Sequence, residues 1–286
     1  MKRKEQQSLD KYYTKSEVAK FCYSSLFEIC KSLNIENIFV IEPSAGDGSF
    51  LSHIIYPNIA FDIAPQKNKN IITQNFLELD LKKYNHLTSQ SNIIFIGNPP
   101  FGKRGKLALQ FLNKCLEEGF IVGFILPIQF RKWSIQSKID SKASLVADLN
   151  LPEDSFLFMN KPYKLRCSFQ VWTNKITHLK NLRIKEKPAI SHPDFDMFQY
   201  NCTRQTEKYF DFAWDFAVPR QGYLDYTIKI FDKELCDKKK QWIFFKAKTT
   251  ESLQKLLLID FEQLSKNNTG TPGFGKHDVI SAYIKK

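Results

Sequence analysis

Short, almost wholly apolar segments recur between residues 38 and 174, and they constrain the fold more than any other feature of the chain. They lie at residues 38–41, 59–62, 71–72, 93–96, 120–127, 144–152 and 167–174. Apolar residues recur at helical spacing in three other segments, which are residues 16–33, a stretch after the glycines near position 48, and residues 107–118. Ser16 is the expected N-cap of the first helix, and Gly119 closes the last. Strands that alternate with helices predict an α/β fold with a mostly parallel sheet covered on both faces.

The sequence changes character after residue 178. Prolines without a clear period are followed by aromatic stretches, one helical stretch near residues 252–266 and a turn-rich tail. We therefore predict two domains, residues 1–178 and a small α+β region at residues 179–286. No apolar stretch is long enough to predict a membrane span. The polar amino-terminal residues lack the apolar core of a secretory signal, so we expect a cytoplasmic or nucleoid-associated protein.

The charge balance favours a polyanionic partner. Lysine and arginine total 42 against 30 acidic residues, a formal net charge of +12. Cations placed near phosphates displace condensed counterions, which favours binding to nucleic acid, although lysine-rich composition alone also makes a chain basic. The six cysteines form no C-x-x-C pair and only five histidines accompany them, so we predict reduced thiols and no metal site.

A glycine-bearing turn follows the first predicted strand. Glu42 ends that strand, and Gly46 and Gly48 come next, where small residues let the backbone approach a ligand. Asp62 ends the following strand, about 20 residues further on, where an acidic side chain can accept hydrogen bonds from ribose hydroxyls. Together these elements predict a site for an adenosine-containing cofactor at the carboxyl ends of the strands.

The segment Asn98-Pro99-Pro100-Phe101 comes directly after the strand at residues 93–96. Two prolines cannot continue a strand, so they leave a stiff loop with exposed carbonyls at the edge of the sheet. The Asn98 side-chain oxygen and the Pro99 carbonyl can accept both hydrogens of one aromatic amine. That favours a pyramidal nitrogen, whose lone pair is then free to attack an electrophilic methyl group. Phe101 supplies a ring for stacking on a base.

The order YYTKSEVA, EPSAGDG, FDIAP, NPPF and CSFQVW over residues 9–175 resembles the gamma class of DNA adenine-N6 methyltransferases. The resemblance implies a Rossmann-like methyltransferase fold, the cofactor S-adenosylmethionine and a carboxyl-terminal target-recognition region. It also implies that a double-stranded DNA substrate presents its adenine flipped out of the helix. Nothing in the sequence resembles a nuclease, so the restriction endonuclease of a restriction–modification pair would be a separate chain.

The resemblance also implies individual site residues. Tyr13 and Thr14 hold the methionine part of the cofactor, Glu42, Ala45 and Gly46 line its cavity, and Asp62 takes the ribose. Phe76 or Ile63 flanks the adenine of the cofactor. Asn75 stands where family members often have aspartate. Asn98, Pro99, Pro100 and Phe101 hold the target amine and base, and Phe169 matches the aromatic residue that packs on the second face of the base.

Several cations are candidates for phosphate contacts: Lys103, Arg104, Lys106, Arg166, Arg220 and Lys276. Two loops, residues 219–222 and 271–276, combine turn residues with a cation and are further candidates. An RNA adenine-N6 methyltransferase is the main alternative, since NPPF serves RNA as well. Methylation of cytosine N4 or of protein glutamine and a non-catalytic nucleic-acid-binding subunit are the others.

Overall fold

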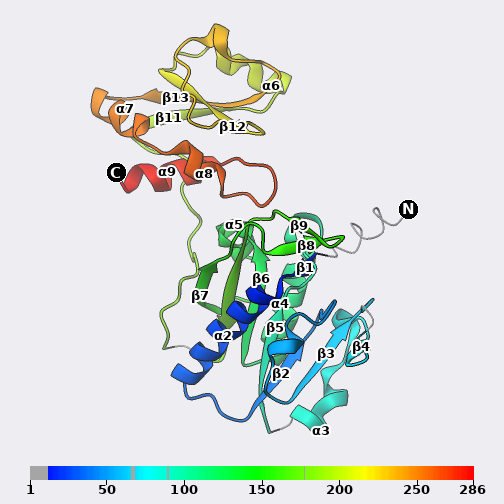
Figure 1. Ribbon diagram of the computed structural model, residues 1–286. Coiled ribbons are helices and arrows are strands. Elements are labelled where there is room, and N and C mark those ends of the chain that lie inside the picture. The colour runs from blue at the N-terminus through cyan, green and yellow to red at the C-terminus, as the bar shows by residue number, and fades with distance from the viewer. Residues whose placement is uncertain (1–11, 66–67, 89, 177) are drawn as a thin grey trace. The chain divides into compact units, whose positions relative to one another are not determined.

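The computed structural model describes residues 12–65, 68–88, 90–176 and 178–286, so residues 9–11, where the resemblance begins, lie outside the described residues. The chain divides into two compact units. The first ends at Lys185 and the second is Glu186–Lys286. The first unit, from blue to green in Figure 1, holds every segment quoted for the resemblance.

A seven-stranded sheet forms the centre of the first unit. Its strands are β2 (Ile38–Glu42), β3 (Asn58–Asp62), β4 (Ile71–Thr73), β5 (Asn92–Gly97), β6 (Ile121–Pro127), β7 (Ser144–Asn150) and β10 (Cys167–Thr173). Their order in space is β4-β3-β2-β5-β6-β10-β7. The pairs from β4 to β6 are all parallel, whereas β10 is antiparallel to both β6 and β7. The sheet is therefore Rossmann-like and mostly parallel, as predicted, with one reversed strand that the sequence analysis did not anticipate.

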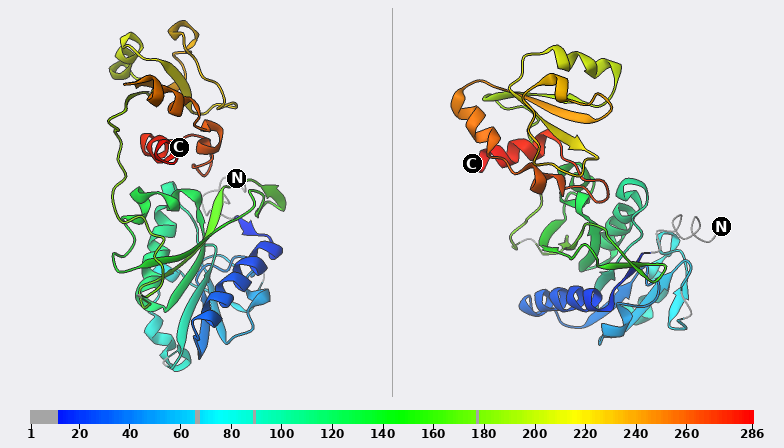
Figure 2. Two further views of the ribbon diagram at one scale, coloured as in Figure 1. Left: turned by 90° about the vertical axis from the view of Figure 1, so that its left-hand side faces the viewer. Right: turned by 45° about the horizontal axis from the view of Figure 1, so that its top comes forward.

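Helices cover both faces of this sheet (Figure 2). Helix α2 (Ser16–Ser32) packs with Ile38 and Val40 of β2, and helix α4 (Lys106–Glu118) packs with Phe39 and Ile41. Successive residues of β2 thus enter opposite cores, which explains why the strand is apolar throughout.

Two helix predictions fail near the glycine turn. The helix expected after it is only a 3-10 turn, η1 (Leu51–His53), because Pro57 and the start of β3 follow within a few residues. Ser16 is not the N-cap of α2 either. Lys15 precedes the helix without a side-chain cap, and the Ser16 hydroxyl lies 3.2 Å from Nε2 of His53.

A second, three-stranded antiparallel sheet joins the start of the chain to a hairpin. Strand β1 (Tyr13–Thr14) pairs with β8 (Phe156–Phe158), which pairs with β9 (Lys161–Tyr163). This hairpin occupies the connection between β7 and β10, where a parallel arrangement would need a helical crossover. Because β10 runs antiparallel to β7, no such crossover is needed.

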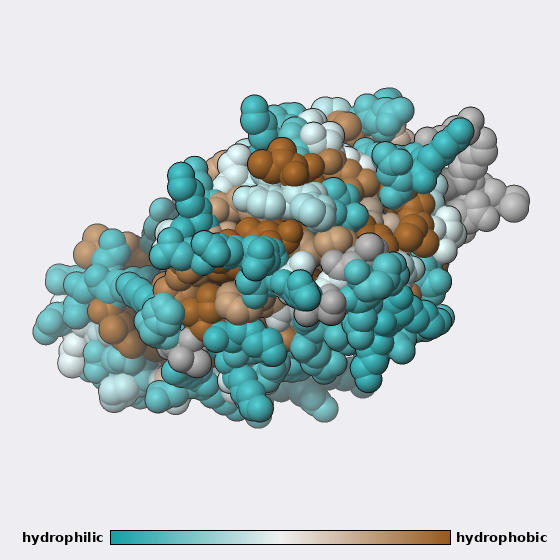
Figure 3. Space-filling model, turned by 90° about the horizontal axis from the view of Figure 1, so that it is seen from below, coloured by the Kyte–Doolittle hydropathy of each residue, from teal (hydrophilic) through white to brown (hydrophobic). Residues whose placement is uncertain are grey.

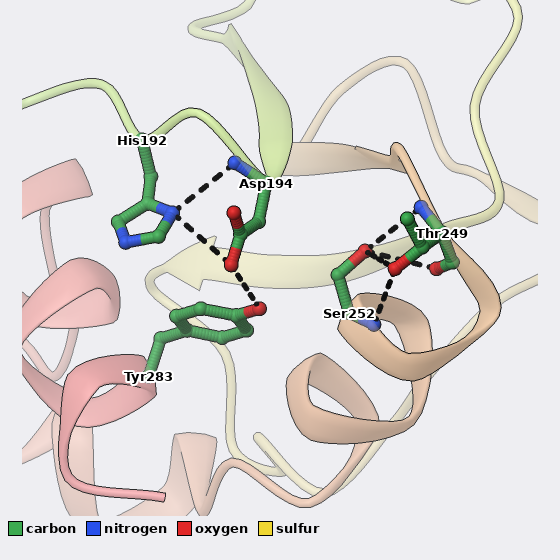
Figure 4. Close-up of polar contacts among 5 residues, drawn as sticks. All are labelled: His192, Asp194, Thr249, Ser252 and Tyr283. Carbon is green, nitrogen blue, oxygen red and sulfur yellow. Dashed lines mark hydrogen bonds and ion pairs between the residues drawn. The ribbon is translucent and has the colours of Figure 1, made fainter.

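The second unit is built on an antiparallel sheet in the order β11-β13-β12. The strands are β11 (Phe195–Tyr200), β12 (Phe216–Gln221) and β13 (Gln241–Ala247), and the helices are α6 (Arg204–Glu207), α7 (Thr250–Leu257), α8 (Phe261–Ser265) and α9 (Lys276–Ile284). The helix expected near residues 252–266 is divided into α7 and α8, because Asp260 caps a new helix through its bond from the Gln263 N–H. A reciprocal cap between Thr249 and Ser252 begins α7, and the Tyr283 hydroxyl of α9 donates to Asp194 at 2.8 Å (Figure 4).

The two units meet in the sequence at Lys185 rather than at residue 178. Arg183 explains the difference, because its guanidinium donates to four carbonyl groups of the first unit, those of Gln136, Ile139, Asp140 and Ala143. The Leu182 N–H also donates to the Leu145 carbonyl at 2.8 Å. The segment after β10 is thus bound to the first unit.

Among the described residues, no helix combines the length and the apolar character needed to cross a bilayer. The surface in Figure 3 shows the molecule from below the view of Figure 1. Apolar side chains form patches there that are separated by hydrophilic ones, which is ordinary for the surface of a folded protein.

Candidate cofactor and amine-binding site

A cavity of about 300 Å³ opens at the carboxyl ends of β2, β3 and β5. A smaller cavity of about 30 Å³ adjoins it and shares five lining residues, Tyr12, Tyr13, Ser44, Gly46 and Asn98. The larger cavity is also lined by the predicted residues Asp62, Ile63, Asn75, Phe76 and Pro100, and the smaller one by Thr14, Glu42 and Ala45. The structure therefore brings the predicted cofactor residues and Asn98 together where open α/β sheets bind ligands.

Asp62 fixes the shape of the glycine turn. Its Oδ2 accepts a hydrogen bond of 2.8 Å from the Gly46 N–H, and its Oδ1 accepts one of 2.7 Å from the Ala64 N–H. Gly46 has a φ of +56°, and a Cβ there would lie 3.3 Å from Cε1 of Tyr13. Each oxygen of the half-buried carboxylate keeps a second acceptor position, so Asp62 can hold the turn and still accept a ligand hydroxyl.

Glu42 places a buried carboxyl group in the smaller cavity. Its residue is 1% exposed, and its Oε2 has no hydrogen-bond partner among the described residues. Burial raises the pKa of this carboxyl well above its usual range, and the nearby Asp47 and Asp62 raise it further. A buried acceptor without a donor carries a desolvation cost, which a cationic ligand group would relieve.

Asn98 presents a second buried acceptor. Its Nδ2 donates to the Tyr12 carbonyl at 3.2 Å, which sets the orientation of the amide. The Ser44 hydroxyl donates to the Asn98 backbone carbonyl at 3.1 Å. The side-chain Oδ1 remains buried without a partner among the described residues. The amide is thus held as an acceptor, which is the orientation that binding of an amine requires.

The rest of the predicted loop divides between cavity and core. Pro100 lines the larger cavity, whereas Pro99 is buried and belongs to neither lining. Phe101 is half-buried and packs against the cores on both faces of the sheet. Its carbonyl accepts hydrogen bonds from the N–H groups of Leu107 and Ala108, at 3.1 and 3.3 Å, so the loop leads directly into α4.

Two apolar side chains and an amide border the far end of the larger cavity. Ile63 is 60% exposed, while Phe76 is 2% exposed and stacks on Phe111 at 5.6 Å between ring centroids. Asn75 caps the 3-10 turn η2 (Phe76–Glu78), since its Oδ1 accepts from the Leu77 N–H at 3.2 Å. Its Nδ2 donates to Glu78 at 2.7 Å. Ile63 is thus the side chain that is accessible for contact with an adenine, and Phe76 forms part of the floor of the cavity.

Phe169 lies away from both cavities. It is fully buried on β10, and a Cβ at Gly123 of β6 would lie 2.8 Å from its Cζ. The place of Phe169 in the motif order predicted that this ring packs on the second face of a target base. In this conformation the neighbouring strand and α2 enclose the ring, and it has no face open to a base.

The predicted phosphate-binding cations fall into two groups. Lys103, Arg104 and Lys106 are exposed in the turn that follows Gly102, which lines the larger cavity. The other three are engaged within the protein. Arg166 lies 3.8 Å from Glu153, Arg220 donates to Asn201 at 2.9 Å, and Lys276 donates to the Met197 carbonyl at 2.7 Å. Burial lowers the pKa of Lys276, which agrees with its packed position.

The two carboxyl-terminal loops predicted as contacts lie side by side. Gln221 forms a β-bridge with Gly273, and the Gly222 N–H donates to the Pro272 carbonyl at 3.3 Å. They therefore form one surface element of the second unit.

Sequence reasoning missed three residues that shape the site. Tyr12 and Ser44 hold Asn98 in place, and both lie within the quoted segments YYTKSEVA and EPSAGDG, although neither was assigned a role. Lys114 had no sequence signal. From α4 it donates to the carbonyls of Leu77 and Leu79, at 3.0 and 2.6 Å, and lies 5.3 Å from the centroid of the Phe76 ring.

No protein-family model matches this sequence, and no curated protein matches it either. Among solved structures, the chain is similar to a candidate RNA methyltransferase from Pyrococcus horikoshii, with 18% identity and a TM-score of 0.37, covering 59% of this chain and 88% of that one. A candidate hemolysin from Lactococcus lactis has 13% identity and a TM-score of 0.36, covering 55% and 90%. Similarity at this level does not show the activity of this chain, so any inference about activity must rest on the residues of the site.

Proposed function

We propose that this protein transfers a methyl group from S-adenosylmethionine to N6 of an adenine in double-stranded DNA. One observation carries the proposal. Two buried oxygens without partners among the described residues, Oε2 of Glu42 and Oδ1 of Asn98, lie in adjoining cavities at the carboxyl edge of the sheet. One suits the ammonium group of an amino acid and the other suits a neutral aromatic amine. S-Adenosylmethionine and adenine together supply both.

The cavities fit the cofactor part by part. Glu42 would accept hydrogen bonds from its α-ammonium group, and Asp62 from its ribose hydroxyls, through the acceptor positions left by Gly46 and Ala64. Ile63 would cover one face of the cofactor adenine, and Phe76 and Phe111 would form the floor of the cavity beneath it. When bound, the cofactor supplies a methyl group activated by its positively charged sulfur.

Asn98 would act on the target amine. Its Oδ1, fixed as an acceptor by the bond from Nδ2 to Tyr12, would take one amine hydrogen. The Pro99 carbonyl is the expected acceptor of the other, and it would have to become accessible when the amine binds, because Pro99 is buried and lines neither cavity. The nitrogen lone pair would then turn out of the ring system and form the new bond to the methyl carbon, while the bond from that carbon to sulfur breaks and its electron pair stays on sulfur. The nitrogen becomes positively charged and loses its proton afterwards, so no strong base is needed before the attack.

Several features support a nucleic acid as the substrate. The net charge of +12 and the exposed Lys103, Arg104 and Lys106 beside the cavity suit a phosphate backbone. A base inside a duplex must be flipped out to reach the cavity, at a cost of a few kcal/mol. The second unit would recognise the target sequence. RNA remains the alternative, since a basic surface and an Asn-Pro-Pro-Phe loop suit either polymer.

Substitution of Asn98 tests the proposal. We expect Asn98→Ala to bind S-adenosylmethionine with near wild-type affinity but to lose methyl transfer by about a hundredfold or more, as for other preorganised groups that contact the reacting atoms. Calorimetry would measure the binding, and a labelled methyl assay on genomic DNA and on total RNA would measure the transfer. Asn181→Ala is a matched control, because that asparagine bonds Leu145 and Ser144 outside the cavities. Full activity of Asn98→Ala would refute the proposal.

A further inference from the structure

The hairpin β8–β9 ends in a two-residue loop with an unusual residue at its tip. Phe158 pairs with Lys161, so Met159 and Asn160 alone make the turn. Both have left-handed backbone angles, with φ of +51° and +60°. Two successive residues of this kind form the tight turn that matches the twist of a hairpin, and the turn favours asparagine and glycine.

Met159 breaks this preference. A bulky side chain at positive φ is disfavoured, and such outliers cluster at functional positions, where the surrounding structure holds them in place. The residue is also 50% exposed, so it gains little from burial. The turn therefore carries a half-exposed, long, flexible, apolar side chain at a position where asparagine would suit the backbone better.

The hairpin is attached to the candidate amine site. The Tyr12 ring stacks on Tyr163 at 4.9 Å and lies 5.5 Å from Phe158, the residue before Met159. The same Tyr12 accepts the bond from Asn98 through its carbonyl. Figure 1 shows β1, β8 and β9 together at the edge of the first unit where β2 and β5 end. Tyr12 thus contacts both the base of the turn, at Phe158, and the amide that would accept the amine.

Charge around the tip suits a polyanion. Lys161 and Lys164 are exposed on the hairpin and its continuation. The two nearby acids face cations of the protein itself, because Asp154 lies 2.7 Å from Lys15 and Glu153 lies 3.8 Å from Arg166. An apolar tip next to exposed lysines matches the elements that enter a base step while lysines or arginines contact the flanking phosphates.

We infer that Met159 is a wedge that enters duplex DNA at the position left by the flipped adenine, an inference that rests on the proposed function. The side chain would fill the gap in the stack and contact the bases above and below it. It would therefore favour the flipped state of a paired base, and it would matter only where pairing and stacking have to be broken.

Replacing Met159 by Asn separates this effect from a structural one, because asparagine suits the turn. We expect the Met159→Asn protein to have a thermal unfolding temperature equal to or above that of the wild type. It should methylate native genomic DNA about tenfold more slowly, because part of the free-energy cost of flipping the base is no longer offset. Heat-denatured DNA, in which the base is already unpaired, should be methylated at nearly the wild-type rate. Met159→Leu should retain most of the activity on native DNA. Ile55→Asn is the matched control, because it replaces another exposed apolar residue by asparagine, 84% exposed and just before β3, and it should leave methylation of native DNA unchanged.

Permanganate reactivity gives a second readout that does not depend on activity toward single strands. At the methylated sites, the thymine left unpaired opposite the flipped adenine should react in the wild-type complex and react less with Met159→Asn. An equal loss on native and denatured DNA, or unchanged activity together with unchanged thymine reactivity, would overturn the wedge alone. A wild-type protein that methylates neither form of DNA would overturn the proposed function and the wedge with it.

Discussion

The change Glu42→Gln should strengthen the free protein against unfolding at neutral pH and weaken its binding of S-adenosylmethionine. Glu42 is 1% exposed and its Oε2 has no partner among the described residues. Hydrogen bonds to charged groups contribute about 1.5–3 kcal/mol. Loss of the carboxylate from a site shielded from water should therefore raise the dissociation constant about ten- to 150-fold.

The pH dependence has a definite sign. Burial, with Asp47 and Asp62, raises the pKa of Glu42 in the folded protein, while in the unfolded chain a glutamate titrates near about 4.3. Between these two pKa values the folded state binds more protons, so its stability falls as the pH rises. Glu42→Gln should remove this part of the decline. The cofactor ammonium pairs with the ionised form, so the wild-type affinity should fall on acidification and that of the variant should change less.

Calorimetry of cofactor binding at pH 6 and pH 8 would test the predicted change in affinity, and thermal unfolding at the same two pH values would test the predicted change in stability. Glu36→Gln is a matched control, because Glu36 is exposed just before the opposite end of the same strand, β2. Wild-type cofactor affinity in Glu42→Gln would refute the assignment of Glu42 to the ammonium group. An unchanged pH dependence of stability would refute the electrostatic reasoning.

Three further substitutions test other contacts. Asp62→Ala should weaken cofactor binding about tenfold or more and lower the free energy of unfolding by about 1–3 kcal/mol, because the Gly46 and Ala64 N–H groups lose their acceptor. Wild-type affinity by calorimetry would reject its assignment to the ribose. Lys114→Met should raise the cofactor dissociation constant without changing turnover at saturating cofactor, because Lys114 holds the carbonyls of Leu77 and Leu79. An unchanged dissociation constant would contradict that positioning effect. If the Phe101 ring stacks on the target base as the sequence predicts, Phe101→Ala should reduce turnover about tenfold or more while cofactor affinity stays close to wild type. It should also lower the free energy of unfolding, because the ring packs against the cores on both faces of the sheet. A parallel loss of affinity would instead assign this ring to the cofactor.

Local sequence predicted much of the first unit. Strands β2, β3 and β5 were apparent because each contains an apolar run; β2 and β3 end at the acidic residues Glu42 and Asp62, and Asn98 follows the last residue of β5. The carboxyl ends of parallel strands lie at one edge, so residues far apart in sequence were expected to meet, and the two cavities contain them. Glycines and prolines in turns also predict local structure, because each restricts or frees the conformation of its own backbone.

Features that depend on distant partners could not be predicted. The contact of Lys114 with Leu77 and Leu79 spans more than thirty residues and follows no periodic pattern. The reversed direction of β10 depends on its pairing with β6 and β7, which the composition of β10 itself does not indicate. Phe169 was assigned to the site from its position in the motif order, but packing against Gly123 places its ring in the core.

The most direct test of the central claim is nucleoside mass spectrometry after incubation of the protein with labelled S-adenosylmethionine and unmethylated genomic DNA, with total RNA in parallel. The account predicts labelled N6-methyldeoxyadenosine in the DNA, at a restricted set of sequences, and its loss in Asn98→Ala. Label found only in RNA, or only on another atom, would contradict it, as would a protein that binds the cofactor and leaves both polymers unlabelled.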